Sequence, residues 1–233
     1  MQLSKKGISV EVVAEQLRRF KTGFPFLRLE GAATTERGVL APSQEEIDEY
    51  LNEWDNYCAG GSSILKFVPA SGAASRMFKD LFSFLSADYD VPTTDFEKKF
   101  FENIEKFAFF GDLNDMCVKN NKLTIKELVE KGEYKSIVFN LLDFTGMNYG
   151  SLPKGLLKFH TYEDYARTSA EEHFVEGALY AATNGVVKLH FTVSPNHKTL
   201  FEELVAERKA FYENLFNVKY EISFSEQKQS TDT

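Results

Sequence analysis

The sequence has few of the residues that build disulfide-stabilised or zinc-bound proteins. Only two cysteines, Cys58 and Cys117, occur among 233 residues. They lie far apart, with no CxxC motif and no histidine close by in the sequence. This spacing indicates neither a disulfide framework nor a zinc site.

Long apolar runs are also missing. No uninterrupted apolar stretch is long enough to span a bilayer, and residues 1–7 lead into an amphipathic pattern instead of the apolar core of a signal peptide. We therefore expect a cytoplasmic protein with no membrane partner. Basic residues are outnumbered 27 to 35 by acidic ones, giving a net charge of -8. This balance argues against general nucleic-acid binding and is compatible with a local basic pocket.

The stretch at residues 64–85 organises the rest of the chain. An apolar run bounded by Gly60-Gly61 and Pro69 predicts a buried strand. Small residues follow, and apolar residues then recur at helical spacing, namely Met77, Phe78, Leu81, Phe82 and Leu85. A strand, a small-residue turn and a helix start present free N–H groups to anions. Arg76 is expected in the first helical turn, where a cation opposes the helix dipole unless a phosphate lies there. An ordinary strand-to-helix corner is the alternative.

Capping boxes mark four further helix starts. In each, a Ser or Thr is followed three residues later by Glu, as in Ser43 with Glu46, Thr94 with Glu97, Thr124 with Glu127 and Thr168 with Glu171. Residues 9–20 also carry an amphipathic helical pattern. Residues 86–150 are predicted to be helical throughout and are interpreted as a helical insertion.

Strands and helices alternate after this insertion. The helix that starts after Thr168 runs to Ala181, with Asn184-Gly185 as its stop. Strands are expected at residues 186–193 and 218–224, with a helix from Ser194-Pro195 between them. This order predicts a mostly parallel α/β sheet with both faces covered by helices, a three-layer, Rossmann-like fold. We divide the chain into an N-terminal helical extension packed on the domain (1–60), the α/β domain (61–85 and 151–233) and the insertion (86–150).

A second candidate motif is Pro153-Lys154-Gly155-Leu156-Leu157, in which Pro and Gly hold Lys154 on a rigid turn. Together with residues 71–77 it resembles the nucleotidyltransferases of the nucleotide-diphospho-sugar (GT-A-like) fold. That family has a G-x-G-T-R-[ML] loop after its first strand and then a Pro-Lys-x-Leu-Leu segment. Molybdenum-cofactor guanylyltransferases carry a similar Lys-Gly-Leu-Leu. Arg167-Thr168 and Glu172-His173 resemble the start of the family's next helix.

As a whole the chain looks most like a bacterial domain family of unknown function that shares this pattern. The resemblance implies transfer of a nucleotidyl group from a nucleoside triphosphate to a phosphorylated sugar or cofactor, with release of pyrophosphate and with Mg²⁺ as cofactor. Arg76 would offset charge on the leaving pyrophosphate, and Lys154 would bind the α-phosphate or the acceptor phosphate. The nucleotide-binding residues it implies are Ala70, Ser71, Gly72, Ala73, Ala74, Ser75, Gln227 and Thr231. It implies no oligomeric state.

The sequence departs from the family pattern in three ways. Ala73-Ala74-Ser75 stands where the family has Gly and Thr, and the insertion separates Arg76 from Lys154. The family's metal-binding Asp lies on a strand that would follow Thr233, and Asp232 is a poor substitute, so the metal ligands stay unassigned. Because residues 225–233 follow a strand directly, we interpret the chain as a piece of a longer protein. A disordered polar tail is the alternative.

Other interpretations stay open. The chain is alternatively a non-catalytic nucleotide- or sugar-phosphate-binding module, a related glycosyltransferase, or a structural or interaction domain. Glu172 and Glu176 share a helix face with His173 nearby, which fits either a metal site or solvated carboxylates. Lys79 is either a further phosphate ligand or a solvated lysine. His190, inside a strand, is expected to be a packed or edge histidine.

Overall fold

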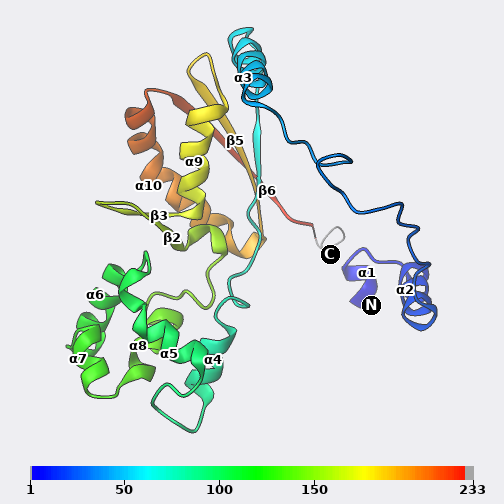
Figure 1. Cartoon of the computed structure of the whole chain (residues 1–233). Helices are drawn as coiled ribbons and strands as arrows, with labels where there is room; N and C mark the ends of the chain where they lie inside the picture. Colours follow the sequence, from blue (N-terminus) through cyan, green and yellow to red (C-terminus); the bar gives the residue numbers. More distant parts are fainter. Residues whose placement is uncertain (1, 229–233) are drawn as a thin grey trace. The chain divides into compact units, whose positions relative to one another are not determined.

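The computed structural model describes residues 2–228. The chain divides into two compact units, residues 1–63 with 227–233 and residues 64–226, and each is described by itself (Figure 1). Within the described residues, no helix combines the length and the hydropathy that crossing a membrane requires.

The first unit contains the predicted N-terminal helices. They are α1 (Gln2–Lys5), α2 (Val10–Thr22) and α3 (Gln44–Ala59). The Ser9 hydroxyl accepts the Val12 N–H at the start of α2, and the capping box of Ser43 and Glu46 starts α3. Neither α2 nor α3 contains a buried residue. The packing of this extension on the α/β domain stays a prediction.

The second unit is built on a sheet whose central strand is β5 (Val186–Val193). On one side β5 pairs in parallel with β6 (Lys219–Glu226). On the other side it pairs in parallel with β1 (Lys66–Pro69) and antiparallel with β4 (Ala182–Thr183). The mostly parallel sheet is therefore confirmed. The parallel pairing puts the carboxyl ends of β1, β5 and β6 at one edge.

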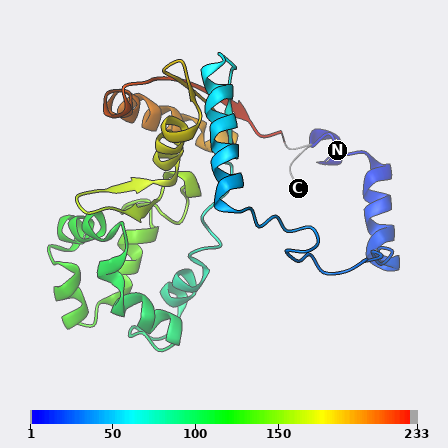
Figure 2. The same cartoon turned by 45° about the horizontal axis from the view of Figure 1, so that its top comes forward.

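The helices α9 (Ser169–Tyr180) and α10 (Lys198–Phe216) cover one face of this sheet (Figures 1 and 2). In β5 every second residue is buried and the intervening ones are not. The other face carries His190, whose ring nitrogens lie 2.8 and 2.9 Å from the hydroxyls of Ser223 and Ser225, and Phe67, which stacks on His190. No helix of residues 64–226 packs on that face within the described structure. The three-layer expectation is therefore wrong for this unit, which has two layers.

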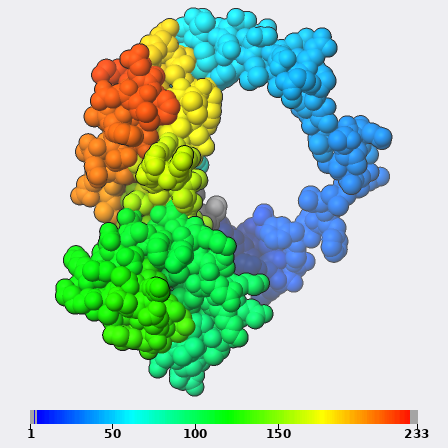
Figure 3. Space-filling model, turned by 60° about the vertical axis from the view of Figure 1, so that its left-hand side comes forward, coloured from blue at the N-terminus to red at the C-terminus, as the bar shows by residue number. Residues whose placement is uncertain are grey.

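The helical segment predicted at residues 86–150 is confirmed as helical. It contains α5 (Asp95–Glu102), η1 (Ile104–Lys106), α6 (Phe110–Asn121), α7 (Ile125–Glu130) and α8 (Tyr134–Leu142). These helices share one core with α4 (Lys79–Ser86), whose Leu81 and Phe84 are buried in it. In sequence order, the buried residues of this core begin with Ala74 and end with Leu157. In Figure 3 the helical residues, coloured green, form one continuous mass.

Three short elements lie between the helical segment and α9 in the sequence, namely η2 (Lys154–Leu156), β2 (Lys158–Thr161) and β3 (Ala166–Thr168). A fourth, η3 (Pro195–His197), lies between β5 and α10. β2 and β3 form an antiparallel hairpin that the sequence pattern did not predict. Asn184 and Gly185, expected to stop α9, form instead the two-residue turn between β4 and β5, with φ of 50° and 74°. Asn-Gly is the sequence that this hairpin turn prefers because both positions need positive φ.

Glu171 links α9 to α10 from a buried position, with only 4% of its surface exposed. Its carboxylate accepts from the Thr168 amide and hydroxyl, from Arg208 Nε at 2.7 Å and from the Tyr212 hydroxyl. Burial by itself raises the pKa of Glu171, but the hydrogen bonds from Thr168 and Arg208 outweigh it and the pKa is lowered.

Replacing Glu171 by Gln should therefore destabilise the fold by about 1–3 kcal/mol at pH 7, because the Arg208 guanidinium loses its charged partner. The lowered pKa means that the stabilisation by Glu171 is present above the unfolded pKa of about 4.3 and is lost as the pH falls through the folded pKa. The difference in the free energy of unfolding between wild type and Glu171→Gln, measured with urea, should therefore shrink below about pH 4. Glu127→Gln, which changes an exposed capping box, is the control and should change the free energy of unfolding little. A difference between wild type and Glu171→Gln that does not depend on pH would contradict this account.

Candidate functional site

Two segments that are far apart in the sequence pair beside the carboxyl end of β1. The Lys154 N–H donates to the Gly72 carbonyl at 3.0 Å, and the Ala74 N–H donates to the Leu152 carbonyl at 3.4 Å. Ala73 and Pro153 thereby form an antiparallel bridge. The small-residue loop also continues the sheet edge, since the Ala70 N–H donates to the Thr192 carbonyl of β5. The two motifs singled out from the sequence therefore lie side by side.

A cavity of about 180 Å³ lies at this junction. Ala70, Gly72 and Lys154 line it together with the first turns of α9, which contribute Ser169, Ala170 and His173. Phe191 and Phe201 form an apolar wall. None of the residues lining the cavity is an Asp or Glu. Ligands of open α/β sheets bind at this edge, outside the carboxyl ends of the strands.

The polar groups at the cavity favour an anion. The amides of Ser71, Gly72 and Ala73 donate to no acceptor among the described residues. Lys154 is exposed and forms no ion pair within the described part of this acidic chain. The N-terminus of α9 adds the positive end of a helix dipole. Backbone amides, lysine ammonium groups and helix N-termini are groups with which proteins bind phosphate.

Arg76 lies outside this cavity. Residues 75–78 form turns, and α4 begins only at Lys79 with Phe78 as its N-cap. The expectation that Arg76 occupies the first helical turn is therefore wrong. The Met77 N–H donates to the Ala74 carbonyl, and Ala74 and Phe78 are buried, which fixes the turn ahead of the helix. Arg76 lines another cavity, of about 500 Å³, with Ser75 and Lys79.

The remaining predicted residues fall in different places. Ala70 and Gly72 line the cavity, and Ser71 and Ala73 belong to the same loop. Ala74 is fully buried in the helical core, so its side chain is structural. Gln227 follows β6 directly and is assigned to the first unit. Thr231 lies outside the described residues.

The acidic residues considered for a metal site have other partners. Glu172 pairs with Arg167 at 3.2 Å and accepts from the Tyr162 hydroxyl. Glu176 pairs with Lys66 at 2.7 Å and lies 2.9 Å from His173 Nδ1. Within the described residues there is no group of three or more His, Cys, Asp or Glu side chains that could hold a metal ion. The described carboxylates thus support the packing of α9 against its neighbours.

The sequence places His173 in the Glu-His pair of the resemblance and beside a candidate metal site, but not with the loop of residues 70–75. Its position follows from the capping box, because helix phase from Thr168 puts Ser169, Ala170 and His173 toward the cavity. The spacing of His173 and Glu176, three residues apart on a helix, is the signal that indicates their contact.

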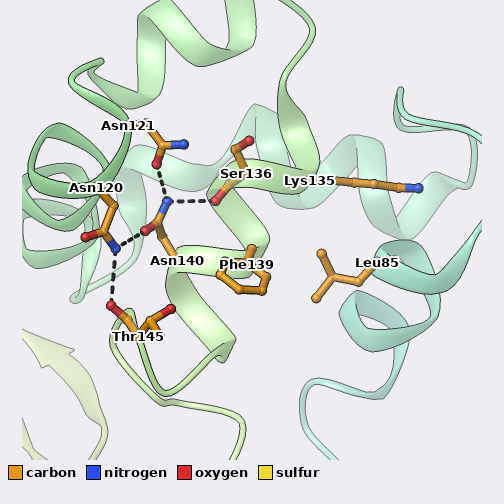
Figure 4. Close-up of a pocket in the computed structure, with 8 residues that line it drawn as sticks. All are labelled: Leu85, Asn120, Asn121, Lys135, Ser136, Phe139, Asn140 and Thr145. Atoms are coloured by element: carbon orange, nitrogen blue, oxygen red, sulfur yellow. Dashed lines mark hydrogen bonds between the residues drawn. The ribbon is translucent and has the colours of Figure 1, made fainter.

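A different cavity, of about 590 Å³, lies among the helices and is lined by several amides (Figure 4). Asn140 is buried, and its amide donates to Asn121 Oδ1 and to the Ser136 carbonyl. Asn120 donates to Asn140 Oδ1 and to the Thr145 carbonyl. These bonds satisfy the amide of Asn140 and anchor the turn after α8. We therefore interpret this cluster as structural.

Comparison with protein families gives a match over the whole chain. A family model described as "Domain of unknown function (DUF4301)" matches residues 1–233. The chain belongs to the DUF4301 family. Comparison with curated proteins and with solved structures found no match. Membership of a domain family of unknown function is thus confirmed, and the resemblance of this DUF4301 chain to nucleotidyltransferases stays a prediction.

The turn that presents Lys154 in this DUF4301 chain depends on Gly155. A Cβ at this position would lie 2.9 Å from Phe201 Cζ, and Phe201 is buried. Gly155→Ala should therefore destabilise the fold by about 1–3 kcal/mol through overpacking.

Gly111→Ala is the matched control, because a Cβ there meets nothing within 4 Å and residue 111 lies in α6. Alanine should stabilise that helix by about 0.5–1 kcal/mol. Equal unfolding free energies for the two variants in urea would show that Gly155 is not held against Phe201.

Proposed function

We propose that this chain binds the phosphate groups of a nucleoside triphosphate or nucleotide sugar at the loop of residues 70–75 and Lys154. The pairing of Gly72 with Lys154 carries this proposal, because it joins a loop whose amides have no acceptor among the described residues to a lysine that lines the same cavity as Gly72. The lining of this cavity includes Lys154 and no Asp or Glu, which suits an anionic ligand.

The size of the cavity limits what it holds. Binding sites for drug-sized ligands have volumes of about 300–1,000 Å³, whereas this cavity has about 180 Å³. It therefore suits a single phosphate group, and the rest of a nucleotide would lie outside it.

We further propose that the bound phosphate takes part in nucleotidyl transfer to a phosphorylated sugar or cofactor, with pyrophosphate as the leaving group. Such a reaction depends mainly on positioning and on neutralising charge. Lys154 would contribute a point charge at the phosphate, and the loop amides would orient it.

The donor set at the cavity does not fit a protein-bound Mg²⁺, because no carboxylate lines it. We assign no residue and no step to the metal.

The second candidate function is binding without transfer. Arg76 and Lys154, the two cations that the resemblance puts on one triphosphate, line different cavities. This separation favours a nucleotide- or sugar-phosphate-binding module.

The first test is binding, measured by calorimetry on the full chain with nucleoside triphosphates, nucleotide sugars and pyrophosphate, with and without Mg²⁺. Lys154→Ala should weaken binding about tenfold or more, since a hydrogen bond to a charged group is worth about 1.5–3 kcal/mol. Lys126→Ala removes the same charge from the exposed face of α7 and should have no effect. No binding by any of these ligands, or equal losses in both variants, would overturn the proposal.

The second test separates transfer from binding alone. Release of pyrophosphate from a nucleoside triphosphate and a sugar 1-phosphate should be lost in Lys154→Ala, because Lys154 contributes the point charge at the phosphate, and kept in Arg76→Ala, because Arg76 lines a different cavity. Binding without any release of pyrophosphate would establish the second candidate function instead.

A further inference from the structure

His173 reaches the phosphate cavity from α9. It lines the same cavity as Gly72 and Lys154, and its ring packs against that of Phe191 in a T-shaped arrangement, with 6.4 Å between ring centroids. His173 is half-buried, with 34% of its side chain exposed. Its ring is therefore held by the protein and still accessible to a small ligand.

One ring nitrogen of His173 is occupied by a fixed carboxylate. Nδ1 lies 2.9 Å from Glu176 Oε2. That carboxylate also accepts from Lys66 Nζ at 2.7 Å and from the Tyr180 hydroxyl at 3.2 Å. Lys66 itself lies over the Tyr180 ring, 4.6 Å from its centroid. A carboxylate at Nδ1 keeps a proton on that nitrogen and orients the ring.

The other ring nitrogen, Nε2, contacts no partner among the described residues. In the neutral ring it carries a lone pair, which repels an anion. In the imidazolium it carries a proton, which an anion accepts. A ligand that bears negative charge therefore favours protonation at Nε2.

The charged groups around His173 come from three elements. Glu176 on α9 favours the imidazolium, while Lys66 on β1 neutralises part of that carboxylate. Lys154 on η2 lines the same cavity and opposes a second positive charge there. Glu172, the neighbouring carboxylate on α9, is paired with Arg167. A bound phosphate group would lower the repulsion between Lys154 and a protonated His173.

We propose that His173 is a phosphate-binding residue that takes up a proton when phosphate enters the cavity, so that anion binding and protonation at Nε2 are coupled. This inference rests on the proposed function. It adds a second cation to the site, because His173 becomes positively charged when the ligand is bound. Binding should be tighter at pH 6.5 than at pH 8.

The test is calorimetry of the full chain with inorganic pyrophosphate in two buffers of different ionisation enthalpy, which gives the number of protons taken up. His173→Gln should lower this uptake and weaken binding at pH 6.5 about tenfold. His160→Gln, which changes an exposed histidine on β2, is the matched control and should behave as the wild type. Protonation of pyrophosphate itself contributes equally to all three proteins and cancels in their comparison.

A measurement on the unmodified chain makes the test independent of whether the variant folds. In NMR titrations, the assigned His173 ring should titrate at higher pH when pyrophosphate is present, and the His160 ring should not. Unchanged titration of His173 would overturn the inference.

The two proposals fail in different ways. If Lys154→Ala weakens binding and His173→Gln changes neither affinity nor proton uptake, the phosphate site stands and the role of His173 is wrong. If pyrophosphate does not bind the wild type, both proposals fall.

Discussion

The antiparallel pairing of residues 72–74 with residues 152–154 is the constraint on which the rest of this unit depends. It brings together the two ends of the long helical segment that lies between them. Bringing the ends of a long segment together costs chain entropy, which contacts within the folded segment must offset. The core of that segment includes Ala74, which belongs to the pairing, and Leu157, which follows it in the sequence. Helical packing and strand pairing therefore stabilise one another. The same pairing puts Gly72 and Lys154 beside one cavity.

Local signals in the sequence were sufficient for most of the helices. Thr94 with Glu97, Thr124 with Glu127 and Thr168 with Glu171 all form reciprocal capping boxes where the pattern predicts them. A capping box satisfies N–H groups within one helical turn, so it needs no tertiary partner. Arg76 shows the limit of this reasoning, because Phe78, without a capping side chain, begins α4 later than the apolar spacing indicates.

Features that depend on distant partners are harder to predict. The strict alternation in residues 186–193 indicates a strand covered on one face, whereas the order of strands and helices favours a doubly covered sheet. Asn184-Gly185 resembles the end of a helix because the two-residue strand β4 is too short to recognise. The order of the motifs predicts that the loop and Lys154 meet. The contact of Lys66 with Glu176, which joins β1 to α9, follows only from the sheet register.

The central claim is that the loop amides and Lys154 bind one phosphate group. The most direct measurement is a ¹⁵N–¹H correlation spectrum of the chain during titration with pyrophosphate. The account predicts that the amide resonances of Ser71, Gly72 and Ala73 shift first and most, because these N–H groups have no acceptor among the described residues. Shifts confined to Arg76, Lys79 and the first residues of α4, or no shift in residues 70–75, would contradict it.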